Sequence, residues 1–220
     1  MEIAVIYNGN EFIIPNTTIS AIIIAIFLII VAVIVSLKIK KAKAEEAPSG
    51  FLNVIELLVE TMDNMVKSNM GEKNMSFSPF ILTLMVFIAA CNLSGLFGLT
   101  PPTSDFGFIF MVALIVFIIA QINHMKSIGI PKYLKCFTEP YALMTPLNII
   151  SELSNPISMS FRVFGNILSG GLVTTLLYTA LGNFSPLIAP LHIYLDIFVG
   201  LLQAFVFVML TMVSINTGEN

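Results

Sequence analysis

The chain has 220 residues, of which 57% are hydrophobic and only 10% are charged, and its formal net charge at pH 7 is −3. Together with a mean hydropathy of +0.95, this composition excludes an ordinary soluble domain, in which about 25% of residues are charged. It is typical of a single polytopic membrane domain over residues 1–220, and no Walker loop, GxGxxG motif or zinc-ligand spacing points to an enzyme with its own catalytic site.

The first apolar run covers residues 19–37. A helix of this length just crosses the roughly 30 Å hydrocarbon core of a bilayer. The preceding segment, 1–18, lacks the positive charge of a signal peptide. Four lysines follow the run directly: Lys38, Lys40, Lys41 and Lys43. The positive-inside rule therefore places the end of this first span in the cytoplasm and the N-terminus outside.

Residues 51–69 have apolar side chains at helical spacing, with acidic and amide side chains between them. This pattern predicts an amphipathic helix that is too polar to span. We expect it to lie on the cytoplasmic membrane surface, and the functional alternative is a docking face for partner subunits.

Two further spans are predicted over 80–99 and 106–122. Asn92 and Ser94 in the first of them favour hydrogen bonds between helices. In the external turn, 100–105, Asp105 either caps the next helix or attracts cations to an external opening. Cys91 and Cys136 lie in an apolar run and a polar loop, so no disulfide is expected.

The positions of the positive charges support this topology. Of ten lysine and arginine residues, only Arg162 is an arginine. Every lysine lies within 38–73 or 126–135, which are both cytoplasmic if three spans separate the outside N-terminus from the second loop. The segments expected outside, 1–18, 100–105 and 183–186, contain none.

The last part of the chain predicts a helical hairpin, with arms over 146–181 and 187–214 and a turn at 182–186. A helix over the first arm would be about 54 Å long, which far exceeds the bilayer core. It must therefore tilt steeply, bend at Pro156, or both. The expected fold is an all-α polytopic membrane protein with about five membrane helices, one amphipathic surface helix and a long, strongly tilted hairpin at the end.

Arg162 lies in the first arm, in an otherwise apolar setting. Its guanidinium keeps its proton, so burial cannot neutralise it. Either it reaches a headgroup or a fixed carboxylate, or it meets a charge that comes and goes. Polar residues recur every three or four positions and form one helical stripe: Glu152, Asn155, Ser158, Arg162, Asn166 and Ser169. Small residues at Gly165, Gly170 and Gly171 of this arm, and at Gly200 of the second arm, allow another helix to come close.

The second arm has its own stripe, formed by His192, Asp196, Gly200 and Gln203. His192 suits the outer interface, and Gln203 suits a hydrogen bond between helices. An aspartate in apolar sequence is costly and therefore indicates function, unless it only bonds a neighbouring helix. If the turn centres near 184–185, Gln203 lies within about a turn of Arg162 and Asn166, and Asp196 lies within about a turn of Gly171.

The run RVFGN followed by SGG resembles the signature of subunit a of the F-type rotary ATP synthase. LQAFVFVMLT at 202–211 is similar to that family's last helix, and NLSGLFGLTPPTSD at 92–105 to its loop after the second span. The resemblance implies a stator that faces a rotating ring of small carboxylate-bearing subunits. It implies a separating role for Arg162 between two aqueous half-channels for H⁺ or Na⁺.

Further expectations follow from this resemblance. Candidate residues for the half-channels are Glu152 on the cytoplasmic side, His192 and Asp196 on the outer side, and Asn166 and Gln203 near the arginine. The implied partners are the ring, the peripheral-stalk subunit b, the soluble head and the lipid bilayer, with no nucleic acid, cofactor or metal. The implied location is the bacterial cell membrane, with the C-terminus in the cytoplasm.

The residues fit two other functional classes less well. A secondary transporter usually has an internal repeat, which is not visible in this chain. A simple cation channel does not need a central arginine, which repels cations.

The chain also departs from the family pattern, because Gly171 stands where many bacterial relatives carry an acid, and Asp196 stands where a histidine or glutamate is common. We expect Asp196 to supply the carboxylate of the outer half-channel.

Overall fold

The computed structural model describes residues 3–7, 10–41, 50–129, 131–133, 135, 145–181 and 185–216. Five helical segments in this part are long and apolar enough to cross a membrane. They are built on α1 (Asn16–Lys41), α3 (Ser78–Leu93), α4 (Phe106–Ile128), α6 (Thr145–Leu181) and α7 (Ser185–Asn216). The prediction of an all-α polytopic membrane protein is confirmed.

Shorter elements connect or precede these helices. The amphipathic helix is α2 (Gly50–Met70), and three short 3-10 turns are η1 (Glu72–Phe77), η2 (Ser94–Phe97) and η3 (Pro102–Ser104). Before α1, the strands β1 (Ile3–Tyr7) and β2 (Asn10–Ile14) form an antiparallel hairpin that pairs Ile3 with Ile14. This β-hairpin was not predicted from the sequence.

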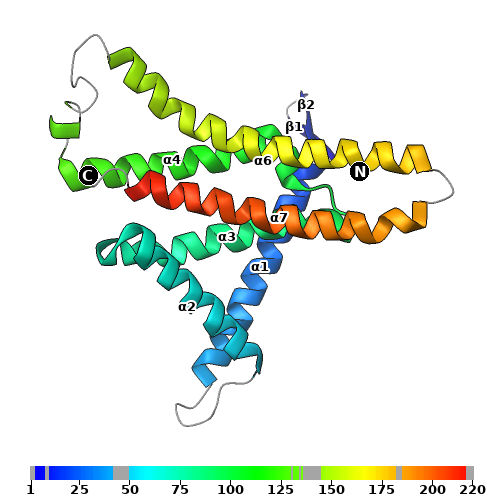
Figure 1. The fold of residues 1–220 in the computed structure, drawn as a ribbon, viewed down its shortest axis with the longest axis horizontal. Coiled ribbons are helices and arrows are strands. Elements are labelled where there is room, and N and C mark those ends of the chain that lie inside the picture. Colours follow the sequence, from blue (N-terminus) through cyan, green and yellow to red (C-terminus); the bar gives the residue numbers. More distant parts are fainter. Residues whose placement is uncertain are drawn as a thin grey trace.

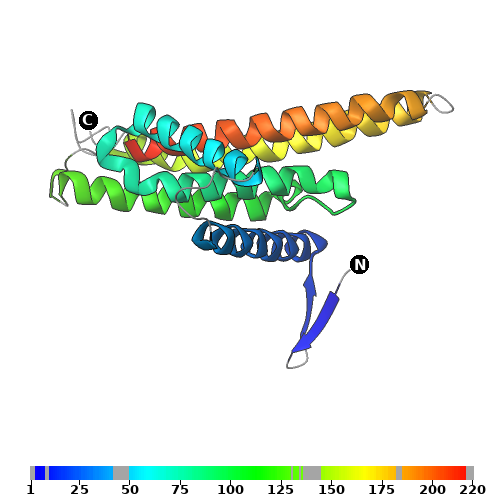
Figure 2. The ribbon, with the colours of Figure 1, turned by 90° about the horizontal axis from the view of Figure 1, so that it is seen from below.

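Four of the long helices run alongside one another, and α1 crosses them steeply (Figure 1). Seen from below, α3 and α4 lie between α1 on one side and α6 with α7 on the other (Figure 2). The contacts agree, because α7 packs on α3, α4 and α6, whereas α1 touches α3 and η3. The core between these helices is apolar, with Ile81, Ile88, Ile109, Val163 and Phe207 among its buried side chains.

Only the second half of the helix α2 packs its apolar side chains into the core. Phe51 and Val54 in the first half are exposed, whereas Met62, Val66 and Met70 in the second half are buried in the core. The Nδ2 of Asn216, at the end of α7, donates a hydrogen bond of 3.0 Å to the carbonyl of Asn69. The apolar stripe expected to face the membrane surface therefore packs against the rest of the chain in this half.

Asp105 starts α4. One of its carboxylate oxygens accepts a hydrogen bond of 2.9 Å from the backbone N–H of Gly107, and the other accepts one of 3.2 Å from Thr17 in α1. A carboxylate in this position satisfies a free N–H of the first helical turn. The geometry supports the capping alternative for Asp105.

The long hairpin forms as the sequence indicates. The helix α6 changes direction in its first half, and Pro156 lies in that half (Figure 1). Both views show α7 beside α6, and the two helices extend together beyond the ends of α3 and α4 (Figures 1 and 2). Much of the turn expected at 182–186 lies outside the described residues.

Candidate functional site

The polar stripes of α6 and α7 meet near the middle of the hairpin. The Nδ2 of Asn166 donates a hydrogen bond of 2.5 Å to the Oε1 of Gln203. Gln203 is almost fully buried, and among the described residues its Nε2 has no hydrogen-bond partner. The hairpin pairing expected from the sequence brings these two amides together, with one buried donor left over.

Arg162 lies one turn before Asn166 on α6. Its side chain is exposed, and it makes no hydrogen bond or ion pair with any residue that the structure describes. The exposed apolar side chains on the two helices include Phe161, Leu168 and Leu172 of α6 and Ile197, Phe198 and Leu201 of α7. A fixed cation on an apolar helical surface is costly unless a neighbouring molecule supplies the compensating charge.

A third helix, α3, also contacts the site. The Nδ2 of Asn92 donates a hydrogen bond of 2.9 Å to the carbonyl of Gly200, which lies one turn before Gln203. A Cβ atom added at Gly200 would lie 3.3 Å from the Cβ of Asn92. The Oδ1 of Asn92 is buried and, in the described part of the chain, has no partner. Asn92 therefore makes the interhelical bond expected of it, and it also brings a free acceptor close to the stripe of α7.

The other glycines behave differently. A Cβ atom added at Gly165, Gly170 or Gly171 would meet no described atom within 4 Å. The close helix approach expected at these three positions is therefore not made by the described residues of this chain. Their small size leaves the α6 surface open to another molecule.

The outer part of the α7 stripe is described only in part. Asp196 is half-buried and lies one turn before Gly200, and Gly171 is exposed on α6. The side chain of His192 lies outside the described residues. The proximity of Asp196 to Gly171 stays a prediction.

Glu152, at the other end of the α6 stripe, bonds to α4. The Nε2 of Gln121 donates to the Oε1 of Glu152, and the hydroxyl of Tyr133 donates to the Oε1 of Gln121 over 2.7 Å. Gln121 and Tyr133 were not predicted as site residues from the sequence. The signal was present, because Gln121 is an amide within the apolar run over 106–122.

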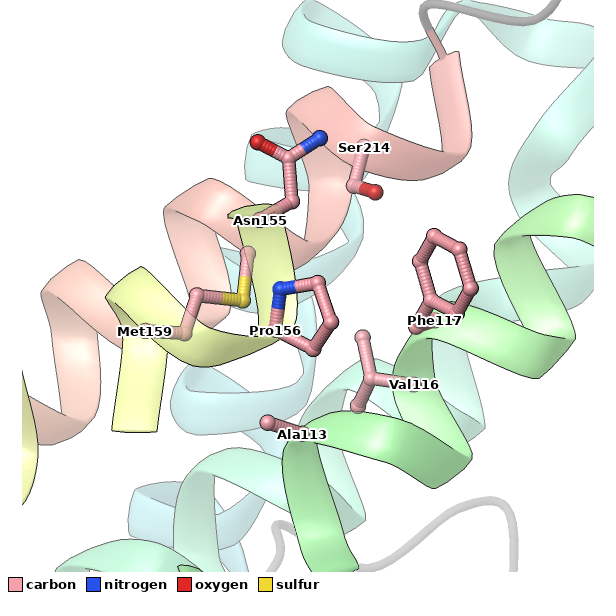
Figure 3. A pocket seen from close by; sticks show the side chains of 7 residues that line it. All are labelled: Ala113, Val116, Phe117, Asn155, Pro156, Met159 and Ser214. Carbon is pink, nitrogen blue, oxygen red and sulfur yellow. The ribbon is translucent and has the colours of Figure 1, made fainter. Parts of the chain in front are cut away.

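A crevice lies where α6 bends, between α4, α6 and α7 (Figure 3). It is too narrow to hold a water molecule. Pro156 and Met159 line it from α6, and Asn155 and Ser214 are the polar residues among those that line it (Figure 3). In this conformation the crevice is closed to water.

The chemistry of the site is that of charge and hydrogen bonding. The described residues contain no group of histidine, cysteine or acidic side chains that could hold a metal ion. Arg162 offers a permanent positive charge, and the Asn166–Gln203 pair offers amide groups beside it. This arrangement can bind and release a mobile carboxylate or conduct an ion past it, without making or breaking covalent bonds.

The family model described as ATP synthase A chain matches residues 18–216. The ATP synthase subunit a of Moorella thermoacetica is 30% identical over 191 residues, which cover 86% of each chain. That of Geobacter sulfurreducens is 36% identical, covering 86% of this chain and 83% of its own. That of Trichlorobacter lovleyi is 34% identical, covering 92% of this chain and 88% of its own.

Proposed function

Because this chain belongs to the ATP synthase A chain family, whose members are ion-translocating subunits of the membrane sector and not the catalytic subunit, we propose that Arg162 is its functional centre. On this proposal, Arg162 faces a ring of small subunits that each carry a carboxylate. The arginine attracts each carboxylate as it arrives and favours its ionised form, so the carboxylate releases its bound H⁺ or Na⁺.

One observation carries the proposal. Arg162 is exposed on the apolar surface of the hairpin and has no partner among the described residues, although it lies one turn from the Asn166–Gln203 pair. An arginine with only a structural role in a membrane is expected to pair within its own chain or, near a helix end, to reach the headgroups, and Arg162 lies near the middle of α6. The exposed position supports a partner that comes from another subunit.

Two half-channels would give the ion access to the ring from opposite sides. Glu152 belongs to the cytoplasmic path and Asp196 and His192 to the outer path, while Asn166 and Gln203 lie near the separating arginine. The permanent charge of Arg162 repels cations and prevents direct leakage between the two paths. Subunit b and the soluble head are the further partners, in a bacterial cell membrane with the N-terminus outside and the C-terminus in the cytoplasm.

The test of the proposal is Arg162→Ala in the complete ATP synthase. We expect ATP-driven ion pumping to fall to background while the complex still assembles with its ring. Arg162→Lys should also fail, because an ammonium group can lose its proton and lacks the planar fork of the guanidinium. The control is Leu153→Ala, which truncates an exposed apolar side chain of the same helix. Coupled pumping at the control rate in either arginine variant would remove Arg162 from the mechanism.

A further inference from the structure

A hydrogen-bonded chain of three side chains lies at the end of α6 that is opposite the α6–α7 turn. It runs from Tyr133, in the short segment 131–133, through Gln121 of α4 to Glu152 of α6. These residues come from three segments that are separated in sequence. They meet because α4 and α6 pack against each other.

The direction of the hydrogen bonds fixes the orientation of the Gln121 amide. A carboxylate accepts hydrogen bonds only, and a phenol can donate to a carbonyl oxygen. The hydroxyl of Tyr133 therefore holds the Oε1 of Gln121, which turns the Nε2 towards Glu152. Without the hydroxyl, the Oε1 of Gln121 loses its donor, and the bond from the Nε2 to the carboxylate is left to hold the amide by itself.

The surroundings keep Tyr133 in its donor form. Burial raises the pKa of the Tyr133 hydroxyl above its usual value, and the negative charge of Glu152 raises it further. The hydroxyl therefore stays protonated over the physiological pH range. The ring of His124 lies edge-on to the ring of Tyr133, with 5.2 Å between their centroids. This ring contact does not use the hydroxyl, so Tyr133→Phe preserves it.

Glu152 also lies at the bend of α6. Pro156, four residues later, has no N–H, so it cannot donate the usual helical hydrogen bond to the carbonyl of Glu152. The same residue thus offers a carboxylate and a backbone oxygen without its usual helical donor. Oxygen groups of this kind suit a cation or a proton carried by water.

We propose that Gln121 and Tyr133 are positioning residues, which hold the Glu152 carboxylate in place at the cytoplasmic end of the ion path. This inference rests on the proposed function, in which Glu152 belongs to that path. Gln121 contacts the carboxylate directly, and Tyr133 acts through Gln121. Neither residue exchanges an ion with the ring.

The first experiment measures ion flux through the membrane sector in vesicles from which the soluble head has been removed. A potassium diffusion potential drives the flux, which is followed with a pH-sensitive dye for H⁺ and with radioactive sodium for Na⁺. Tyr133→Phe and Gln121→Leu should each lower the flux about three- to tenfold, as expected for the loss of one hydrogen bond. Ser151→Ala, which removes an exposed hydroxyl beside Glu152, is the control and should leave the flux unchanged.

Two further results are expected if Tyr133 positions the carboxylate, but not if its role is purely structural. In a Glu152→Gln background, adding Tyr133→Phe should lower the flux no further, because the carboxylate to be positioned is already gone. In the single variant, the dependence of the flux on ion concentration should change on the cytoplasmic side only. Losses that multiply in the double variant, an equal change on both sides, or an unchanged flux in Tyr133→Phe would each overturn the inference.

The Arg162 variants separate this inference from the proposed function. If Arg162→Ala stops pumping but the Tyr133 variant fails its test, only the positioning role is lost. If Arg162→Ala pumps normally, the proposed ion path itself falls, and the positioning role falls with it.

Discussion

Arg162 and Gln203 lie close together on the hairpin but in opposite environments. The arginine is exposed and unpaired by the described residues, whereas the glutamine is buried and bonded to Asn166. Asn166 links the two, because it lies one turn from Arg162 on α6 and contacts α7. The position of the charge is therefore tied to a partly buried interhelical hydrogen bond rather than to an ion pair with a described residue of the chain.

Asp196→Asn removes a carboxylate that we place in the outer half-channel. If the ion is H⁺, flux should fall by about 10²-fold, the lower range for proton transfer by a positioned side chain. Adding Gly171→Glu should recover part of the flux, since a side chain at that position meets no described atom within 4 Å of its Cβ.

The measurement is ion flux at several pH values and Na⁺ concentrations, with co-purification of the complex as the check on assembly. Gly171→Glu alone is the matched control for the double variant, because it adds the same carboxylate without removing the first. An Asp196→Asn protein that conducts at the original rate under all of these conditions would refute the role of Asp196.

The packing of α3 on α7 depends on the small size of Gly200. A Cβ atom at this position would lie 3.3 Å from that of Asn92, so Gly200→Ala should push the helices apart and weaken the Asn92 hydrogen bond. We expect a destabilisation of about 1–3 kcal/mol, as for other overpacked sites.

Gly170→Ala is the control for this prediction. Both substitutions give the helix the same gain in propensity, but a Cβ at position 170 has no described neighbour within 4 Å. The two variants are compared in the detergent-solubilised complex, by the temperature at which the chain is released and by the rate at which a protease cleaves it. Equal stability of the two would show that the α3–α7 contact tolerates a methyl group.

The elements also show what the sequence could reveal. The Asn166–Gln203 contact was predictable, because helices joined by a short turn pair residues at a nearly constant sum of their numbers. The Gln121–Glu152 contact was not predictable, because α4 and α6 are not joined by a short turn. The relative position of these two helices depends on packing throughout the core. The packing of the second half of α2 into the core was not predicted either. The same apolar stripe is expected on a helix whether a membrane or a protein core covers it.

The lysine-bearing end of α4 lies at the left of Figure 1 and that of α1 at the bottom, while both helices begin nearer the centre. The predicted topology places both of these lysine-bearing ends on the cytoplasmic side. A cysteine at Ser104 should react with an impermeant thiol reagent from outside, and one at Lys73 only from inside. Both side chains are exposed, whereas the neighbouring Thr103 is fully buried and unsuitable.

The labelling is carried out on a Cys136→Ser background in right-side-out and inverted vesicles, since Cys136 lies in the lysine-rich loop expected inside. Cys91 is buried and can remain. A reversed labelling pattern would invert the direction assigned to both half-channels.

The extension of α6 and α7 beyond the other helices has a mechanical consequence. The hairpin resembles a cantilever, because α2, α3 and α4 pack against it at one end, whereas its outer end extends beyond them and, among the described residues, consists of the two paired arms (Figures 1 and 2). Under a sideways load, the deflection of such a beam is smallest near the clamp and grows towards the tip. Gln203 lies nearer the clamp than Asp196 does, so the outer arm can yield to a moving neighbour while the region around the arginine stays in register.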